Sequence, residues 1–147
     1  MKFVLETGQN ILIHSYEVGN VSLTGINADH PELKSGLIDE WDTDEHLGIL
    51  KKSALLRTNG TIKAWKPQNN SEFMPEHFSS FTEEQAEIVL FGTGQQLQFP
   101  PQECLSILQR NNLGYEVMDT AAACRTFNVL AAEGRDVILA IVMIEPA

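Results

Sequence analysis

The stretch that decides the fold runs from Glu87 to Ile144: EIVLFGTGQQLQFPPQECLSILQRNNLGYEVMDTAAACRTFNVLAAEGRDVILAIVMI. Its first apolar run, Ile88–Phe91, is followed at once by Gly92-Thr93-Gly94. That pattern is typical of a buried strand that ends in a tight turn. A second strand is predicted over Tyr115–Met118, after a helix stop at Asn111-Asn112-Leu113-Gly114. A very apolar strand closes the stretch.

Helices are predicted between these strands. Pro100 and Pro101 suit the first turn of one, whose apolar face carries Cys104, Leu105, Ile107 and Leu108. The next helix is predicted over Ala121–Glu133, with Asp119 or Thr120 as its N-cap and Gly134 at its end. Strands joined by a helix are expected to be parallel neighbours. The residues therefore predict a βαβ unit in the C-terminal half of an α/β domain.

Hairpin patterns precede this unit. Ile11–Tyr16 and Val21–Thr24 alternate like the strands of an N-terminal β-hairpin. Asn59-Gly60 is a strong two-residue hairpin signal, and it predicts strands over Leu50–Thr58 and Thr61–Trp65.

The remaining segments are less regular. Asn27–His46 is acidic and is predicted to be a loop or insertion, with a helical turn at Pro31–Lys34. A turn of helix is predicted at Pro75–Phe81, and the capping-box pattern Thr82-Glu83-Glu84-Gln85 predicts the start of another short helix. At 147 residues, the chain is expected to form a single domain.

Charge is distributed unevenly. The net charge of −10 disfavours nucleic acid as a partner, because binding phosphates requires surplus lysine and arginine. An acidic group is followed by a basic one: Asp29, Glu32, Asp39, Glu40, Asp42, Asp44 and Glu45, then Lys51, Lys52, Arg57, Lys63 and Lys66. The acidic segment is either a solvated loop folded back near the basic hairpin or a docking surface for a charged partner protein.

Two runs in the C-terminal half carry a family resemblance. LFGTGQQLQFP (Leu90–Pro100) and GYEVMDTAAACRTFNVLAAEGRDV (Gly114–Val137) resemble the signature of a widespread family of small proteins of unknown function. That family includes the mitochondrial complex I assembly factor 3 and the adipogenesis-associated domain protein. The resemblance extends over roughly Ser53–Ile144.

The resemblance implies a three-layer domain with a mixed central sheet of about five strands, whose last strand runs antiparallel to the others. Without it, the helix-linked pattern would predict a parallel last strand. The family offers no established catalytic residues. The role known for its mitochondrial member is to help assemble the respiratory NADH:ubiquinone oxidoreductase.

The candidate site lies where the predicted parallel strands end, because ligands of open α/β sheets tend to bind at that edge. The free N–H groups of the second helix, together with Arg125, could hold an anion. Alternatively, Asp119 caps the helix and Arg125 pairs with a surface carboxylate. Gly92-Thr93-Gly94 matches no complete phosphate-binding motif and suits a tight turn. The candidate ligand- or partner-binding residues are Gly92, Thr93, Gly94, Asp119, Thr120, Arg125 and Asn128.

Reactive side chains give weaker patterns. Cys124 is either a thiolate activated by a helix start or a buried structural cysteine, and Cys104 is predicted to lie in the core. The histidines are scattered, at His14, His30, His46 and His77. Asp42, Asp44 and His46 could contact a cation, but we expect no specific metal site and no cofactor.

These patterns favour a bacterial cytoplasmic protein that acts as a non-catalytic interaction or assembly module. A protein partner is expected, with respiratory-complex subunits as candidates, and a homo-oligomer stays open. The start of the sequence is not typical of a signal or transit peptide, and no apolar run is long enough to span a bilayer. The alternative is a carboxylate- or phosphate-binding protein, or an enzyme, using the crevice between Gly92–Gly94 and Asp119–Arg125.

Overall fold

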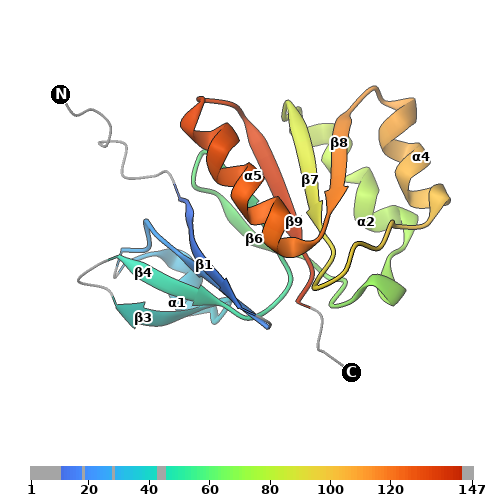
Figure 1. Ribbon diagram of the computed structural model, residues 1–147. Coiled ribbons are helices and arrows are strands. Elements are labelled where there is room, and N and C mark those ends of the chain that lie inside the picture. Colours follow the sequence, from blue (N-terminus) through green and yellow to red (C-terminus); the bar gives the residue numbers. More distant parts are fainter. Residues whose placement is uncertain (1–10, 18, 28, 43–45, 144–147) are drawn as a thin grey trace.

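The computed structural model describes residues 11–17, 19–27, 29–42 and 46–143, and Figure 1 shows their arrangement. The N-terminal part forms a four-stranded antiparallel sheet in the order β1-β2-β4-β3. Its elements are β1 (Ile13–Glu17), β2 (Asn20–Leu23), the short helix α1 (Pro31–Ser35), β3 (Ile38–Asp42) and β4 (Leu47–Leu50). The predicted N-terminal hairpin is confirmed, since β1 pairs with β2.

The C-terminal part is built on a five-stranded mixed sheet in the order β6-β5-β9-β7-β8. Strand β7 is parallel to both β8 and β9, whereas β5 is antiparallel to β6 and β9. The predicted mixed sheet is therefore confirmed. Its strands are β5 (Ala54–Arg57), β6 (Ile62–Ala64), β7 (Ile88–Gly92), β8 (Gly114–Met118) and β9 (Val137–Ile141).

The expectation that the last strand runs antiparallel to the others was wrong. Strand β9 is parallel to β7, with Val89 beside Ile138, and is antiparallel to its other neighbour, β5. Helices α4 (Gln102–Arg110) and α5 (Thr120–Ala132) connect β7, β8 and β9. Because each helix returns the chain to the same end of the sheet, the three strands run in one direction. The helix-linked pattern alone predicts this arrangement.

Both faces of the five-stranded sheet are covered, which explains why β9 is apolar throughout. Val137, Leu139 and Ile141 pack in one core with α5 and the four-stranded sheet. On the other face, Ile138, Ala140 and Val142 pack with residues of α2 (Pro75–Ser79), α3 (Phe81–Glu84) and α4. Figure 1 shows α5 and α4 on opposite sides of the sheet.

An aromatic cluster fastens the segment before β7 to the second face. Phe78 stacks on Phe91 of β7 with ring centroids 5.3 Å apart, and Trp65 lies 5.5 Å from Phe73. The Trp65 indole N–H also donates to the carbonyl of His77 at 3.3 Å. These contacts fix the short 3-10 helix η2 (Asn70–Glu72) in place between Trp65 and Phe73. Large aromatic side chains of this kind dominate core energetics.

The structure corrects two predictions in the N-terminal half. The helical turn at Pro31–Lys34 is confirmed by α1, but Ile38–Asp42 forms the edge strand β3 instead of a loop. Leu50–Thr58 is not one strand. The chain leaves the first sheet after Leu50 and enters the second at Ala54, where Ser53 Oγ accepts the Met143 N–H at 3.2 Å.

The structure also corrects the predicted starts of two helices, α3 and α4. The predicted capping box at Thr82 was wrong: Thr82 lies inside α3, and its hydroxyl donates to the Ser79 carbonyl at 2.7 Å. Helix α4 begins at Gln102, so Pro100 and Pro101 precede it. Among the described residues, no helix combines the length and apolar character needed to cross a bilayer.

Candidate functional site

The turn after β7 and the start of α5 are joined by hydrogen bonds. Thr93 N–H donates to the Met118 carbonyl at 2.9 Å. Gly94, whose φ of 102° suits glycine, donates its N–H to Thr120 Oγ1 at 2.8 Å, and Thr120 N–H returns a bond to the Gly94 carbonyl at 2.9 Å. The structure thus brings these predicted site residues together. It also engages the amides of Thr93, Gly94 and Thr120 within the protein.

Gly92 is placed where α5 approaches the sheet closely. A Cβ at this position would lie 3.2 Å from Thr120 Oγ1, 3.3 Å from Thr120 Cα and 3.4 Å from Ala123 Cβ. Thr120 and Ala123 are both buried. The absence of a side chain at Gly92 therefore lets the first turn of α5 pack directly on the end of β7.

Asp119 is the N-cap of α5. Its Oδ1 accepts the Ala122 N–H at 2.8 Å, and its carbonyl accepts the Ala123 N–H at 2.9 Å. The carboxylate thereby interacts favourably with the positive end of the helix dipole. An external anion at this helix start would have to share that position with Asp119.

Arg125 and Asn128 have different surroundings. Arg125 is exposed and borders a hollow of about 290 Å³ between α5 and β1, together with Tyr16 and Cys124. Asn128 instead holds β1: its Oδ1 accepts the Ile13 N–H and its Nδ2 donates to the Ile13 carbonyl, each at 2.9 Å. Asn128 therefore attaches the four-stranded sheet to α5.

Tyr16 is a neighbour of this site that sequence reasoning missed. Burial raises the pKa of its phenol, and the nearby Cys124 and Asp119 act in the same direction, against a hydrogen bond with the Thr120 side chain. Its position beside α5 depends on how the two sheets dock. Local strand alternation in Ile11–Tyr16 does not encode that contact.

Cys124 is a poor candidate for a nucleophile. It is 4% exposed, and burial raises its pKa to about 12, against a smaller lowering effect of Arg125. Burial and the charge of Glu103 also raise the pKa of Cys104. Because the thiolate is the reactive form, both residues are chemically quiet at neutral pH.

We accordingly expect iodoacetamide to label both thiols of the native protein at neutral pH more slowly than a free-cysteine peptide. Mass spectrometry of the labelled peptides measures the two rates separately. The protein unfolded in urea, where both side chains are solvated, provides the control and should label readily. Labelling of native Cys124 faster than the peptide would restore it as a candidate nucleophile.

A second surface feature lies in the segment Gln95–Pro101 between β7 and α4, here called the Phe99 loop. Leu97 and Phe99 are 53% and 66% exposed. The loop borders a hollow of about 440 Å³ that is lined by Asn69, Asn70, Ser71, Gln98, Phe99 and Pro101. Large apolar side chains exposed beside a hollow are typical of interaction sites.

The Phe99 loop is held by polar contacts from both sides. Thr93 Oγ1 donates to the Gln96 carbonyl at 2.8 Å and accepts the Gln98 N–H at 3.1 Å. Asn70 Nδ2 donates to the Thr93 carbonyl at 3.1 Å and to Gln98 Oε1. Sequence reasoning missed this surface because Gln95–Phe99 has neither strand nor helix periodicity. The signal that could have found it is an uncharged segment carrying a leucine and a phenylalanine between glutamines.

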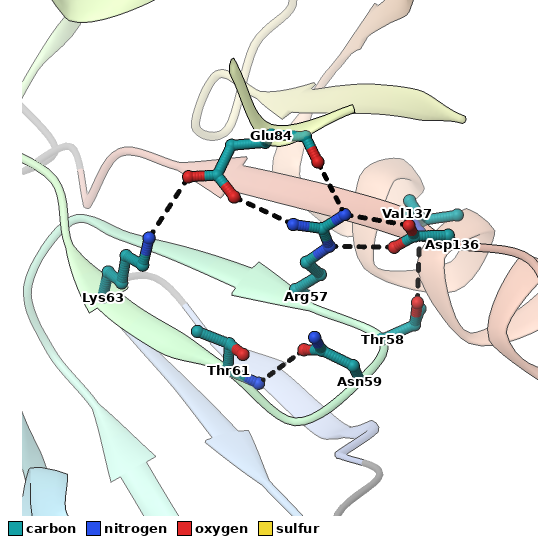
Figure 2. A network of polar contacts seen from close by, with 8 residues as sticks. All are labelled: Arg57, Thr58, Asn59, Thr61, Lys63, Glu84, Asp136 and Val137. Carbon is teal, nitrogen blue, oxygen red and sulfur yellow. Dashed lines mark hydrogen bonds and ion pairs between the residues drawn. The ribbon is translucent and has the colours of Figure 1, made fainter. Parts of the chain in front are cut away.

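At the other end of the sheet, Arg57 links three segments (Figure 2). Its Nε and Nη2 donate to the Asp136 carboxylate at 2.9 and 2.8 Å, and its Nη1 donates to Glu84 Oε1 at 2.8 Å. Lys63 reaches the same Glu84 at 3.2 Å. We interpret this network as a clamp between β5, the end of α3 and the start of β9, because each Arg57 nitrogen is already hydrogen-bonded within the protein.

The acidic segment meets the basic hairpin at one described ion pair, between Lys51 and Asp39 at 3.2 Å, with both side chains more than half exposed. Exposed pairs of this kind contribute on the order of 0–1 kcal/mol to the free energy of unfolding.

In the part of the chain that the structure describes, no group of three or more His, Cys, Asp or Glu is arranged to hold a metal ion. Asp44 and the side chain of Asp42 lie outside the described part.

Comparisons with known proteins agree with this architecture. The family model described as "Protein of unknown function (DUF498/DUF598)" matches residues 13–142. Among solved structures, the NMR structure of a Xanthomonas campestris protein superposes with a TM-score of 0.68 at 25% identity, covering 93% of this chain and 89% of that one. A Bordetella pertussis protein described as a Mth938-like domain superposes with a TM-score of 0.63 at 20% identity, covering 100% of this chain and 95% of that one.

A rat protein (Rattus norvegicus) named NADH dehydrogenase (ubiquinone) 1 alpha subcomplex assembly factor 3 is 34% identical over 77 residues. The match covers 51% of this chain and 42% of the relative, so the chain spans less than half the length of that protein. The family model, in contrast, covers nearly all of the described residues. This chain belongs to the DUF498/DUF598 family of proteins of unknown function.

Proposed function

We propose that the chain is a non-catalytic protein-interaction or assembly module of the bacterial cytoplasm, and that the Phe99 loop is its partner-binding surface. The observation that carries the proposal is the exposure of Leu97 and Phe99 beside a hollow of about 440 Å³. Interfaces are enriched in aromatic residues and depleted of charge at their centres. The Phe99 loop has both properties.

The Cys124 thiol and the backbone amides at the start of α5 favour a binding function over a catalytic one. An activated nucleophile needs a lowered pKa or an adjacent base, whereas burial raises the pKa of Cys124 to about 12. The amides of Thr93, Gly94 and Thr120, which could stabilise a reacting oxygen, already bond within the protein. These contacts suit a rigid junction between β7 and α5.

Assembly is the activity that the relatives favour. The rat relative is named as an assembly factor for NADH dehydrogenase, and its match covers 42% of its length. By analogy, we propose respiratory-complex subunits as the partners of this chain. The Phe99 loop would then contact an incompletely assembled subunit.

Affinity purification from the organism that expresses the protein tests this proposal. Tagged wild-type protein and the double variant Leu97→Ser/Phe99→Ser are compared by quantitative mass spectrometry, with Val129→Ser as the matched control. Val129 is 56% exposed and lies on α5, far along the chain from the Phe99 loop. We expect specific respiratory-complex subunits with wild type and Val129→Ser, and their loss with the double variant. Equal recovery of those subunits by all three proteins would contradict the proposal.

A second candidate function is the binding of a small carboxylate or phosphate beside Arg125, in a hollow between α5 and β1 whose lining does not include the predicted Gly92–Gly94 turn. The observation that favours this function is that Arg125 and Tyr16 border the same hollow of about 290 Å³ between α5 and β1. Within the part of the chain that the structure describes, Arg125 forms no ion pair. A cation and a phenol that border one hollow could bind a small anion.

Arg125→Ala should weaken such anion binding while changing the free energy of unfolding by less than about 0.5 kcal/mol, because the side chain is exposed. Titration with phosphate, sulfate and small carboxylates, followed by amide NMR shifts, measures the binding. Arg110→Ala removes another exposed arginine, on α4, and should leave the shifts unchanged. If no shifts cluster at residues 119–125, the second candidate fails.

A further inference from the structure

We propose that the Phe99 loop binds an apolar segment of another protein that is flanked by lysine or arginine residues. This inference rests on the proposed function and adds the chemical class of the partner. It is carried by the distribution of charge around the loop, which differs from that of the chain as a whole.

The centre of the surface is free of charge. From Ile88 to Gln102 the sequence contains no acidic or basic residue, although 20 acidic and 10 basic residues occur in the chain. The hollow beside Phe99 is likewise lined by amides, a serine, a proline and Phe99 itself. Removing such a surface from water does not require the burial of a charge.

The flanks of the surface are acidic. Glu72 directly follows the hollow-lining turn Asn69–Ser71, and Glu103 lies two residues after the loop, in the first turn of α4. Both are exposed, and residues 69–72 and 95–103 contain no lysine or arginine. Charges at the rim of an interface select partners of opposite sign and raise the association rate. A partner with basic residues on either side of its apolar contact fits this arrangement.

The same charges disfavour other occupants. A second copy of the chain would bring another net charge of −10 and place glutamates against glutamates. A membrane rich in anionic lipid would be repelled for the same reason. Thr93 and Asn70 already hold the loop in place by hydrogen bonds. Binding the basic, apolar segment therefore costs little conformational entropy for ordering the loop.

A displayed library of random 12-residue peptides tests the partner class. Immobilised wild-type protein is used for selection, with Phe99→Ser and Val129→Ser as parallel targets. We expect the peptides selected by wild type and by Val129→Ser to carry an apolar centre with lysine or arginine on both sides. Their binding should weaken at least about tenfold in Phe99→Ser, as for a central aromatic contact. It should also weaken on going from about 50 to about 300 mM salt, because rim charges are screened.

Selected peptides that are acidic or uncharged, that bind Phe99→Ser equally well, or that do not emerge at all would overturn the inference. If the wild-type protein without peptide sediments as a dimer and Phe99→Ser sediments as a monomer, the inference would be overturned in favour of a second copy of the chain. Binding of wild type to anionic vesicles that Phe99→Ser abolishes would overturn it in favour of a membrane. The affinity purification with Leu97→Ser/Phe99→Ser tests the interaction module separately from the peptide selection. Loss of a specific partner there, combined with failed peptide selection, would leave the interaction module standing and remove only the basic partner class.

Discussion

Gly92→Val should lower the free energy of unfolding by about 1–3 kcal/mol, as expected for overpacking of a close-packed contact. Any Cβ at residue 92 would lie within 3.4 Å of Thr120 and Ala123, and both γ-methyl groups of valine add to this crowding. The φ of Gly92 is not in the left-handed region, so the cause is the close approach of α5 instead of backbone strain. Urea unfolding, followed by circular dichroism, measures the loss.

Gly114→Val is the matched control for this prediction. Gly114 starts β8, and a Cβ there would meet its nearest neighbour, the Glu87 carbonyl oxygen, at 3.4 Å. We therefore expect stability close to that of wild type. A Gly92→Val protein that unfolds like wild type but no longer binds its partner would contradict the structural role of Gly92 and make the turn a functional site.

Arg57→Ala should also lower the free energy of unfolding by about 1–3 kcal/mol, because it leaves hydrogen-bonded carboxylates without their partner. The Arg57 side chain is 18% exposed and bonds Asp136 and Glu84 across three segments. Lys63→Ala, which removes a more exposed partner of Glu84, should cost on the order of 0–1 kcal/mol. Equal losses in the two variants would contradict the clamp.

The Arg57 clamp also predicts a pH dependence. The hydrogen bond from Arg57 holds the pKa of Asp136 below its ordinary value, with the charge of Arg57 acting in the same direction against burial. A lowered folded-state pKa stabilises the protein above the unfolded value, near 4, and the contribution is lost as pH falls through the folded value. Wild-type stability should thus decline below about pH 4, and Arg57→Ala should decline less. The Arg135 hydrogen bond lowers the pKa of Glu87 in the same sense and remains in both proteins.

The C-terminal half was predictable because its signals are local. Apolar runs bounded by glycine, an N-cap at Asp119 and a stop at Gly134 define β7, α5 and their neighbours without reference to distant residues. The parallel direction of β9 also follows from its helical connection, and an expectation taken from family resemblance misled on that point.

The N-terminal half depends on contacts that no local pattern contains. Near Ser53, where the chain changes sheets, the Ser53 hydroxyl accepts a hydrogen bond from the backbone N–H of Met143, 90 residues away. Strand β1 is positioned by Asn128 on α5, which places Tyr16 beside Cys124. The candidate residues of the turn were correctly placed beside one another. Their hydrogen bonds to each other, and the exposure of Leu97 and Phe99, became visible only in the folded chain.

We propose the Phe99 loop as the surface through which this protein binds a partner. The most direct test of this proposal is the photo-crosslinking amino acid benzoylphenylalanine, placed at residue 99 in the organism that expresses the protein, with the exposed residue 129 as the control position. The benzophenone ring replaces a side chain that is already aromatic, so the fold should tolerate it. We predict a discrete crosslinked partner protein from residue 99 and none from residue 129. The same adducts from both positions, or none from residue 99, would contradict the account.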